Sequence, residues 1–201
     1  QDYNQHPGIS ASAIKAGRAS MMQMRHCMVT PRDSEPPTPA MRWGTLAHAA
    51  LFEPARFAGS VAVWTGGRRQ GAKWDSWKAD HKGKQIVTPE ELARLEAMQA
   101  AVRANRDARL FMGRVEAVEA SMTWTRADVG PCKGRPDCIG DRWIGDYKTA
   151  RDIDQRRLFS QFAGLGYAHQ LAWYRDGFET ISKQQVQACW ILVQQSMPPY
   201  E

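Results

Sequence analysis

The segment 135–149 (RPDCIGDRWIGDYKT) constrains the fold of this chain most, because it predicts two short strands joined by a tight turn. Ile139 and Ile144 are apolar strand residues on either side of the Gly-Asp pair 140–141, which is typical of turns. The segment therefore predicts a β-hairpin in which the residues before the first strand come back beside the second strand.

Three charged residues converge in this predicted hairpin. Asp137 returns to the neighbourhood of Asp146, and Lys148 lies two residues after Asp146, so both side chains of the second strand share one face. Carboxylate oxygens suit a hard cation such as Mg²⁺, and a lysine can orient a water molecule. The trio predicts a site for metal-dependent phosphodiester cleavage, although charges at an exposed strand end give the same pattern without function.

Composition narrows the class of protein. A chain of 201 residues suits one domain with a sizeable core, and its net charge of +6 suits a polyanionic partner. No apolar run approaches the roughly 20 residues needed to span a bilayer, and we see no secretory leader. The cysteines show no zinc-site spacing, which predicts reduced thiols at Cys27, Cys132, Cys138 and Cys189.

Periodicity and capping signals predict a mixed α/β (α+β) domain over residues 1–201. Its N-terminal part, 1–110, is mostly helical, and 111–201 forms the core. The predicted helices run from Ser10 to about Cys27, from Thr38-Pro39 to about Phe52, from Thr88 to near Asn105, and over about 154–176, ended by Gly177. The predicted strands cover roughly 115–127, 132–139, 142–148 and 186–193, and residues 30–39 form a proline-rich loop.

A basic segment at 64–85 stands apart from these elements. Its six cations face two acids, three tryptophans are interleaved, and three glycines in its first half suggest that this half is mobile. Cations that contact phosphates and rings that stack on bases predict a nucleic-acid contact, whereas the tryptophans can instead pack into the core. The candidate DNA-binding residues here are Arg68, Arg69, Lys73 and Lys78.

Four motifs in order give the chain a family resemblance. Pro136-Asp137 with Asp146-Tyr147-Lys148 resembles the PD-(D/E)xK nuclease superfamily, with Asp where many members have Glu. The segments "GTLAHAALFEP" (44–54), "VEASMTW" (118–124) and "YAHQLAWY" (167–174) resemble three further motifs of its RecE-like, or exonuclease VIII, branch. The resemblance covers nearly the whole chain and implies a restriction-endonuclease-like core, a mixed central sheet flanked by helices with an N-terminal helical segment.

The resemblance assigns roles to residues outside the hairpin. It implies that His48 ligates the metal through a neutral imidazole, although a histidine among alanines can also belong to a core. It favours Glu119 over Glu116 as a further carboxylate, although an exposed strand carboxylate gives the same pattern. A period of two along a strand would place Glu119 on one face with Ser121 and Thr123. Gln170 and Tyr174, four residues apart, would share a helix face near the metal or a phosphate, unless that face packs on the sheet.

Asp137, Asp146 and the backbone carbonyl of Tyr147 are the central expected ligands of Mg²⁺, with Mn²⁺ as a substitute. Lys148 is expected to position the attacking water or to stabilise negative charge in the transition state. Arg135, directly before the Pro-Asp pair, is expected to reach a phosphate.

The resemblance implies a phage or prophage exonuclease that degrades linear double-stranded DNA from 5′ ends and leaves 3′ single-stranded tails. It also implies a ring-shaped oligomer, an annealing or recombinase partner, and a continuation beyond residue 201. The reduced cysteines and the lack of a membrane-spanning run predict a cytoplasmic location without membrane contact. A RecB-like nuclease of other polarity, an endonuclease and an inactive DNA-binding module remain alternatives.

Overall fold

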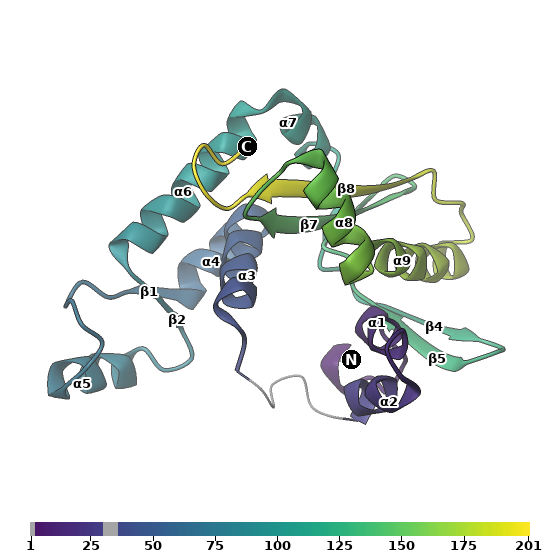
Figure 1. Cartoon of the computed structure of the whole chain (residues 1–201), viewed down its shortest axis with the longest axis horizontal. Coiled ribbons are helices and arrows are strands. Elements are labelled where there is room, and N and C mark those ends of the chain that lie inside the picture. Colours follow the sequence, from purple (N-terminus) through teal and green to yellow (C-terminus); the bar gives the residue numbers. More distant parts are fainter. Residues whose placement is uncertain (1–2, 30–35) are drawn as a thin grey trace.

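A computed structural model describes residues 3–29 and 36–201 and confirms the mixed α/β fold. In this described part, a four-stranded mixed sheet has the order β3-β6-β7-β8 and helices flank it (Figure 1). The β3–β6 and β6–β7 pairs are antiparallel, and β7–β8 is parallel. The bounds are β3 Ala117–Val118, β6 Cys138–Gly140, β7 Trp143–Ala150 and β8 Ala188–Gln195.

The predicted hairpin is confirmed as β6 and β7, with Ile139 opposite Ile144. Arg142 occupies the left-handed region in the turn, with a φ of 52°. Gly140 is required by packing, because a Cβ there would lie 2.1 Å from Nε1 of Trp143. The second strand therefore has a fixed register, which sets the position of every side chain on β7.

Each face of β7 contacts a separate apolar cluster. Trp143 and Tyr147 pack with residues of α3 (Pro39–Phe52) and α6 (Pro89–Ala104). Ile144, on the other face, packs with residues of α1 (Ala11–Gly17), α9 (Tyr167–Ser182), β4 (Met122–Arg126) and β5 (Gly130–Gly134). Because side chains alternate along a strand, Asp146 and Lys148 share the face of Ile144.

Helices α3 and α6 begin and end close to where the sequence predicts. The side chain of Thr38 caps α3, and Thr88 forms the expected capping box with Glu91 at the start of α6. In α6 the buried residues are Leu95, Met98 and Val102, and Leu92 packs against the same apolar cluster.

The helix predicted from Ser10 to Cys27 is wrong as a single element. Ser10 caps α1 as expected, but α1 ends at Gly17 and α2 (Met21–Val29) begins after a break in which the Ser20 side chain accepts a hydrogen bond from the backbone N–H of Gln23. Met21 and Met28, both in α2, are exposed.

The long helix predicted over 154–176 is also divided. Helix α8 (Gln155–Leu165) ends at Gly166, which has a left-handed φ of 67°, and α9 begins directly after it. Gly177 does not end α9. It lies inside the helix, where a Cβ would come within 2.7 Å of the Trp124 ring, so the glycine serves close packing.

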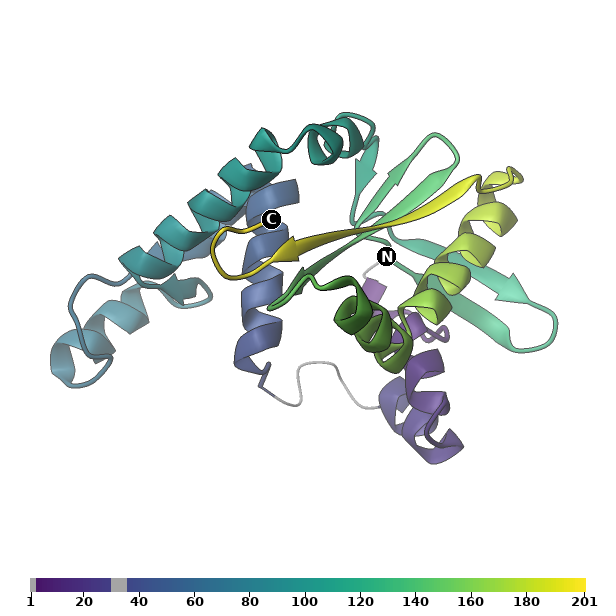
Figure 2. The same ribbon diagram turned by 45° about the horizontal axis from the view of Figure 1, so that its top comes forward.

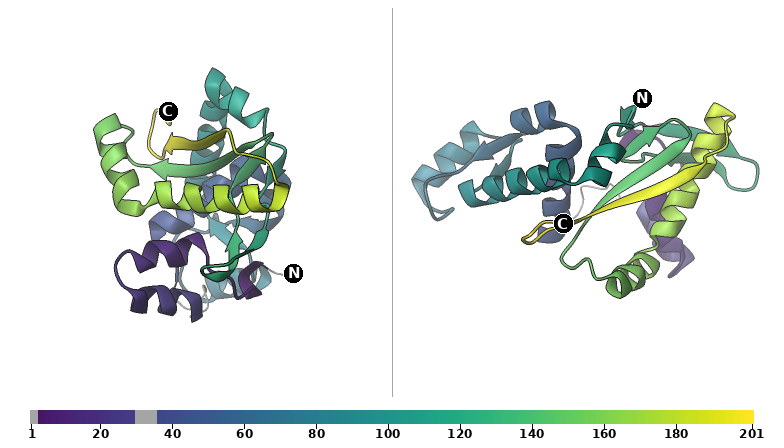
Figure 3. Two further views of the ribbon diagram at one scale, coloured as in Figure 1. Left: turned by 90° about the vertical axis from the view of Figure 1, so that its right-hand side faces the viewer. Right: turned by 90° about the horizontal axis from the view of Figure 1, so that it is seen from above.

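Two predicted strands are each split between sheets. Residues 115–127 form β3 and β4 (Met122–Arg126), and residues 132–139 lie in β5 (Gly130–Gly134) and β6. Strands β4 and β5 form a separate antiparallel pair, which projects beyond the central sheet (Figure 3). The chain leaves the central sheet at Glu119, so the expectation that Glu119 shares a strand face with Ser121 and Thr123 is wrong.

The basic segment is folded into an arm. Strands β1 (Val61–Val63) and β2 (Gln85–Val87) pair in parallel, and α5 (Ala72–Asp80) between them forms the end of the arm most distant from the central sheet (Figure 2). Trp64 is buried and contacts the rings of Trp74 and Trp77, which supports packing of these tryptophans within the protein.

The remaining short helices are η1 (Tyr3–Gln5), α4 (Pro54–Ser60) and α7 (Arg106–Met112). Within residues 3–29 and 36–201, no helix has both the length and the apolar character that crossing a bilayer requires. Residues 30–35 of the expected proline-rich loop lie outside the described residues.

Candidate metal centre

Three candidate metal ligands from different elements converge at one end of the central sheet. His48 comes from α3, Glu119 from the end of β3, and Asp137 from the residue before β6. One potential ligand atom from each lies within 4.8 Å of the other two. Nε2 of His48 is 3.4 Å from Oε1 of Glu119 and 3.7 Å from Oδ1 of Asp137. The fold therefore brings together two carboxylates and an imidazole far apart in the sequence.

Glu119 reaches this cluster through an unusual backbone conformation. Its φ is 52°, a left-handed value that costs a residue with a side chain about 1–3 kcal/mol. Its backbone N–H donates to the carbonyl oxygen of Asp137 at 3.1 Å, and Nε of Arg135 lies 2.7 Å from Oε2. Glu116, the alternative carboxylate, is exposed and lies outside the cluster.

Asp137 is held by the neighbouring strand, as the hairpin predicts. Its Oδ2 accepts a hydrogen bond from the backbone N–H of Tyr147 at 2.6 Å, so Oδ1 is turned toward His48. Burial raises the pKa of Asp137 above its ordinary value, against the opposing effect of Lys148. A cation in the cluster would favour the ionised form that burial disfavours.

Asp146 lies beneath the cluster and is only 1% exposed. Its Oδ2 is 2.5 Å from Nζ of Lys148, and its Oδ1 accepts a hydrogen bond from Nε2 of Gln170 at 3.0 Å. Burial, together with the charge of Asp137, raises the pKa of Asp146 to about 7. Both oxygens of Asp146 are thus contacted by donors of the chain itself.

Lys148 lies between the acids and an aromatic ring. Burial acts to lower its pKa, but the negative charges of Asp146 and Asp137 outweigh that effect and raise it. Its Nζ also donates to the carbonyl oxygen of Tyr147 at 3.2 Å and lies 5.2 Å from the centre of the Tyr167 ring. Lys148 is therefore cationic, which suits electrostatic stabilisation better than proton abstraction.

Gln170 and Tyr174 share the face of α9 that meets the sheet. Both are buried, and Nε2 of Gln170 donates to the Tyr174 hydroxyl at 3.1 Å. Tyr174 belongs to the apolar cluster around Ile144 and reaches Asp146 only through Gln170. The expected Gln–Tyr pair is present, with Tyr174 placed as a packing residue.

The unpartnered nitrogen of His48 tests whether a metal suits this cluster. Nε2 is buried and has no hydrogen-bond partner among the described residues. Burial lowers the pKa of His48, against the raising effect of Glu119, which favours the neutral ring. A neutral nitrogen facing two carboxylates leaves a position that a cation would satisfy, and one imidazole with carboxylate oxygens is a suitable donor set for Mn²⁺ or Mg²⁺.

A cleft of about 970 Å³ opens over this centre. His48, Glu119, Asp137 and Lys148 line it, and it extends to Gly83 and Gln85 at the base of the basic arm. Gly44, one turn before His48, also lines it. A Cβ at Gly44 would meet only Oγ1 of Thr149, at an ordinary 3.6 Å, so packing in the described part does not require this glycine.

The predicted DNA-binding residues fall into two groups. Arg135 lines the cleft and pairs with Glu119, and its guanidinium lies 4.7 Å from the Tyr3 ring centre. The cations of the arm are exposed and do not line the cleft; they are Arg68, Arg69, Lys73 and Lys78. Sequence reasoning missed Lys15, Tyr3 and Tyr167, because they contact the centre only through the tertiary fold.

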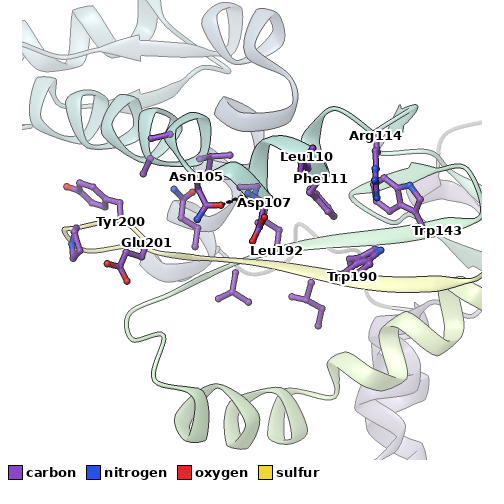
Figure 4. A pocket seen from close by; sticks show the side chains of 18 residues that line it. Asn105, Asp107, Leu110, Phe111, Arg114, Trp143, Trp190, Leu192, Tyr200 and Glu201 are labelled. Carbon is purple, nitrogen blue, oxygen red and sulfur yellow. Dashed lines mark hydrogen bonds between the residues drawn. The ribbon is translucent and has the colours of Figure 1, made fainter.

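A second pocket, of about 780 Å³, lies apart from the metal centre. It is bounded by α6, α7, β8 and the C-terminal residues, with Phe111, Trp143 and Trp190 at one end (Figure 4). None of the residues that line it belongs to the centre, and its surface is mainly apolar. This pocket does not contribute to the chemistry proposed below.

Comparison with known proteins places the chain in a family and supports its fold. A family profile described as "PDDEXK-like domain of unknown function (DUF3799)" matches residues 10–201. A solved structure described as a "putative exonuclease from Eubacterium rectale" is similar with a TM-score of 0.61 and 15% sequence identity, covering 97% of this chain and 70% of its own. No curated protein matches the sequence. At this identity the structural likeness shows the fold alone.

Proposed function

This chain belongs to the PDDEXK-like family DUF3799, and from that membership we propose that it is a Mg²⁺-dependent exonuclease of linear double-stranded DNA, acting from 5′ ends. The observation that carries the proposal is the approach of His48, Glu119 and Asp137 to within 4.8 Å, at the mouth of a cleft and beside the pair Asp146–Lys148. We propose that residues 1–201 act as one nuclease domain.

We propose that His48, Glu119 and Asp137 hold the metal ion, with Asp146 and the Tyr147 carbonyl beside them. Mg²⁺ or Mn²⁺ in this place would polarise the phosphate and activate a water molecule for attack on phosphorus. The chain supplies the charge, the orientation and the shielding from bulk water that make such an ion effective.

Lys148 supplies a fixed positive charge on the floor of the cleft. Its pairing with Asp146 at 2.5 Å and its position over the Tyr167 ring orient Nζ before any substrate arrives. A preoriented cation stabilises the extra negative charge of a pentacoordinate phosphate more than the charge of the starting diester. We assign Lys148 this electrostatic role.

We propose that the DNA backbone runs from the metal centre along the cleft toward the basic arm. Arg135 and the exposed arm cations would contact phosphates without regard to sequence. The resemblance to RecE-like enzymes supports three further proposals, namely 3′ single-stranded tails as product, an annealing or recombinase partner, and assembly of copies into a ring.

A comparison of linear and circular duplexes tests the proposed activity. In Mn²⁺ or Mg²⁺, we expect linear DNA to be degraded and covalently closed circles of the same sequence to persist, because an exonuclease requires an end. A 5′ label should leave the duplex early in small products, whereas a 3′ label should stay in long strands. Denaturing gels with each label measure both outcomes.

Other results of this assay contradict the proposal. Equal cleavage of circles indicates an endonuclease, and early release of the 3′ label indicates the opposite polarity. Metal-dependent binding of linear DNA without any cleavage indicates an inactive DNA-binding module.

His48→Ala is expected to raise the Mn²⁺ concentration for half-maximal cleavage by about 10-fold or more, since the substitution removes a ligand of the ion. The His169→Ala variant is the control, because His169 is exposed on α9 and does not line the cleft. Mn²⁺ titrations and thermal melts of both variants separate the two roles considered for His48. A lower melting temperature with an unchanged Mn²⁺ requirement would make His48 a core residue.

Replacing Arg68, Arg69 and Lys73 by Ala is expected to weaken DNA binding about equally for all sequences. The slope of log affinity against log salt should shrink by roughly 0.9 for each phosphate that the protein no longer neutralises. Single-turnover cleavage at saturating DNA should change little, because these residues lie outside the cleft. Affinities measured by anisotropy at several salt concentrations give the slope.

A matched variant removes the same charge elsewhere. Arg103, Arg106 and Arg109 are exposed on α6 and α7 and do not line the cleft. Their replacement by Ala should leave the salt slope unchanged. Equal slopes for both triple variants would indicate that net charge, and not the arm, governs DNA affinity.

A further inference from the structure

We infer that Lys15 is a positioning residue, which orients the Gln170 amide so that Gln170 holds Asp146 in place. The inference rests on the proposed metal-dependent activity and extends the centre to helix α1, a segment with no motif of its own. Lys15 is 131 positions before Asp146 in the sequence, yet a single residue separates their side chains in the structure.

The hydrogen bonds run continuously from Lys15 to Asp146. Nζ of Lys15 donates to Oε1 of Gln170 at 2.9 Å. Nε2 of Gln170 then donates to Oδ1 of Asp146 at 3.0 Å and to the Tyr174 hydroxyl at 3.1 Å. Oδ2 of Asp146 is left to Lys148 at 2.5 Å. Every polar atom of the Gln170 side chain is therefore engaged.

Donor and acceptor chemistry makes Lys15 and the ionised Asp146 fix this arrangement together, since a carboxylate only accepts. An amide can be turned over, with its oxygen and nitrogen exchanged, at little steric cost. An ammonium group only donates, so with Lys15 in place the oxygen of Gln170 must face Lys15 and the NH₂ group must face Asp146. Tyr174 cannot fix the orientation alone, since a hydroxyl both donates and accepts.

The N-terminal segment is anchored so that Lys15 reaches this position. Ile9 pairs with β5, where its N–H donates to the Pro131 carbonyl at 2.9 Å and its carbonyl accepts from the N–H of Lys133 at 2.8 Å. Ser10 then caps α1, and Ala13, 1% exposed, belongs to the apolar cluster that also contains residues of α9. Helix α1 lies beside α9 as a result (Figure 3).

The structure also places Lys15 near Tyr167 at the border of the cleft, with Nζ 5.5 Å from the ring centre. Lys15 could therefore act on DNA directly, as a cation for phosphates. The two roles predict different results. A positioning residue acts through Gln170, so its loss changes metal binding even in the absence of DNA. The loss of a residue that only binds phosphate leaves metal binding unchanged.

The test is Mn²⁺ binding to the DNA-free protein, measured by electron paramagnetic resonance of unbound Mn²⁺. We expect Lys15→Met, which keeps the length of the side chain but cannot donate, to weaken Mn²⁺ binding by about 10-fold, as removal of an outer partner of a metal site does. Lys15→Arg keeps a donor and should recover most of the affinity. Arg18→Met removes the same charge one turn later and should bind Mn²⁺ like the parent protein.

A double-mutant cycle distinguishes action through Gln170 from action elsewhere. In a Gln170→Leu background, Lys15→Met should cost no further Mn²⁺ affinity, because the residue on which Lys15 acts is already gone. Additive effects, or unchanged Mn²⁺ affinity in Lys15→Met with only DNA binding weakened, would overturn the inference. Because these readouts use no DNA cleavage, a parent protein that binds Mn²⁺ but does not cut DNA would disprove the proposed activity and leave this test intact.

Discussion

Removal of divalent metal with excess EDTA is expected to reduce cleavage of linear duplex DNA to background. In the described part of the chain, the candidate centre offers an unpartnered imidazole nitrogen and carboxylate oxygens, and a cation would satisfy both. Added Mg²⁺ or Mn²⁺ should restore cleavage. Ca²⁺ should support DNA binding with little cleavage, because it fills the site but orients the attacking water poorly.

Thermal stability gives a second measure of metal binding to the candidate centre. An ion that binds only the folded chain stabilises it by RT ln(1 + [L]/Kd), about 2.7 kcal/mol at 100 times Kd. Mn²⁺ should therefore raise the melting temperature of the parent protein and raise that of a Glu119→Gln, Asp137→Asn double variant much less. Undiminished cleavage in excess EDTA would contradict a metal-dependent mechanism, whatever the melting data show.

The hairpin could be predicted from the sequence because its signals are local. A turn dipeptide, flanking apolar residues and a period of two suffice to place Asp137 beside β7 and to put Asp146 and Lys148 on one face. The same holds for α3 and α6, whose starts are marked by Thr38 and Thr88. Capping and alternation depend on neighbours within a few residues, so they can be read without the fold.

Boundaries set by tertiary packing could not be predicted in this way. Gly166 and Gly177 are both glycines in an apolar helical stretch, yet Gly166 breaks the helix with a left-handed backbone and Gly177 continues it against Trp124. Only the position of the Trp124 ring, from a strand 53 residues earlier, distinguishes them. Sequence periodicity contains no such information.

Site residues that belong to a sequence motif could be predicted from the sequence. Site residues that only contact a motif residue in the folded structure could not. The sequence favoured Glu119 over Glu116 by resemblance, but its period-two argument failed, because the chain turns at a positive φ to bring the carboxylate inward. Lys15 carries no local signal at all. Its hydrogen bond with Gln170 exists only because Ile9 pairs with β5 and sets helix α1 beside α9.

Asp146→Asn is expected to lower the rate of cleavage by roughly 10²-fold or more, as the loss of one preorganised group in an active site does. The substitution keeps the shape of the side chain but removes the charge that fixes Lys148 at 2.5 Å and that would favour a nearby cation. Single-turnover rates at saturating DNA and Mn²⁺ measure the effect on chemistry apart from binding.

Stability should change far less than the rate in this variant. Burial raises the pKa of Asp146 to about 7, which means that the folded protein bears a cost to ionise this group at neutral pH, and the neutral amide removes that cost. The loss of the ion pair with Lys148 acts in the opposite direction, and so does the NH₂ group of Asn, which must face a donor, either Lys148 or Gln170. With these effects opposed, we expect the melting temperature at pH 7 to remain close to that of the parent protein.

The control is Asp141→Asn, in the exposed turn of the same hairpin, which should leave both rate and melting temperature unchanged. A folded Asp146→Asn protein with near-parental activity would show that the catalytic charge lies elsewhere, and the centre would then have to be rebuilt around His48, Glu119 and Asp137 alone.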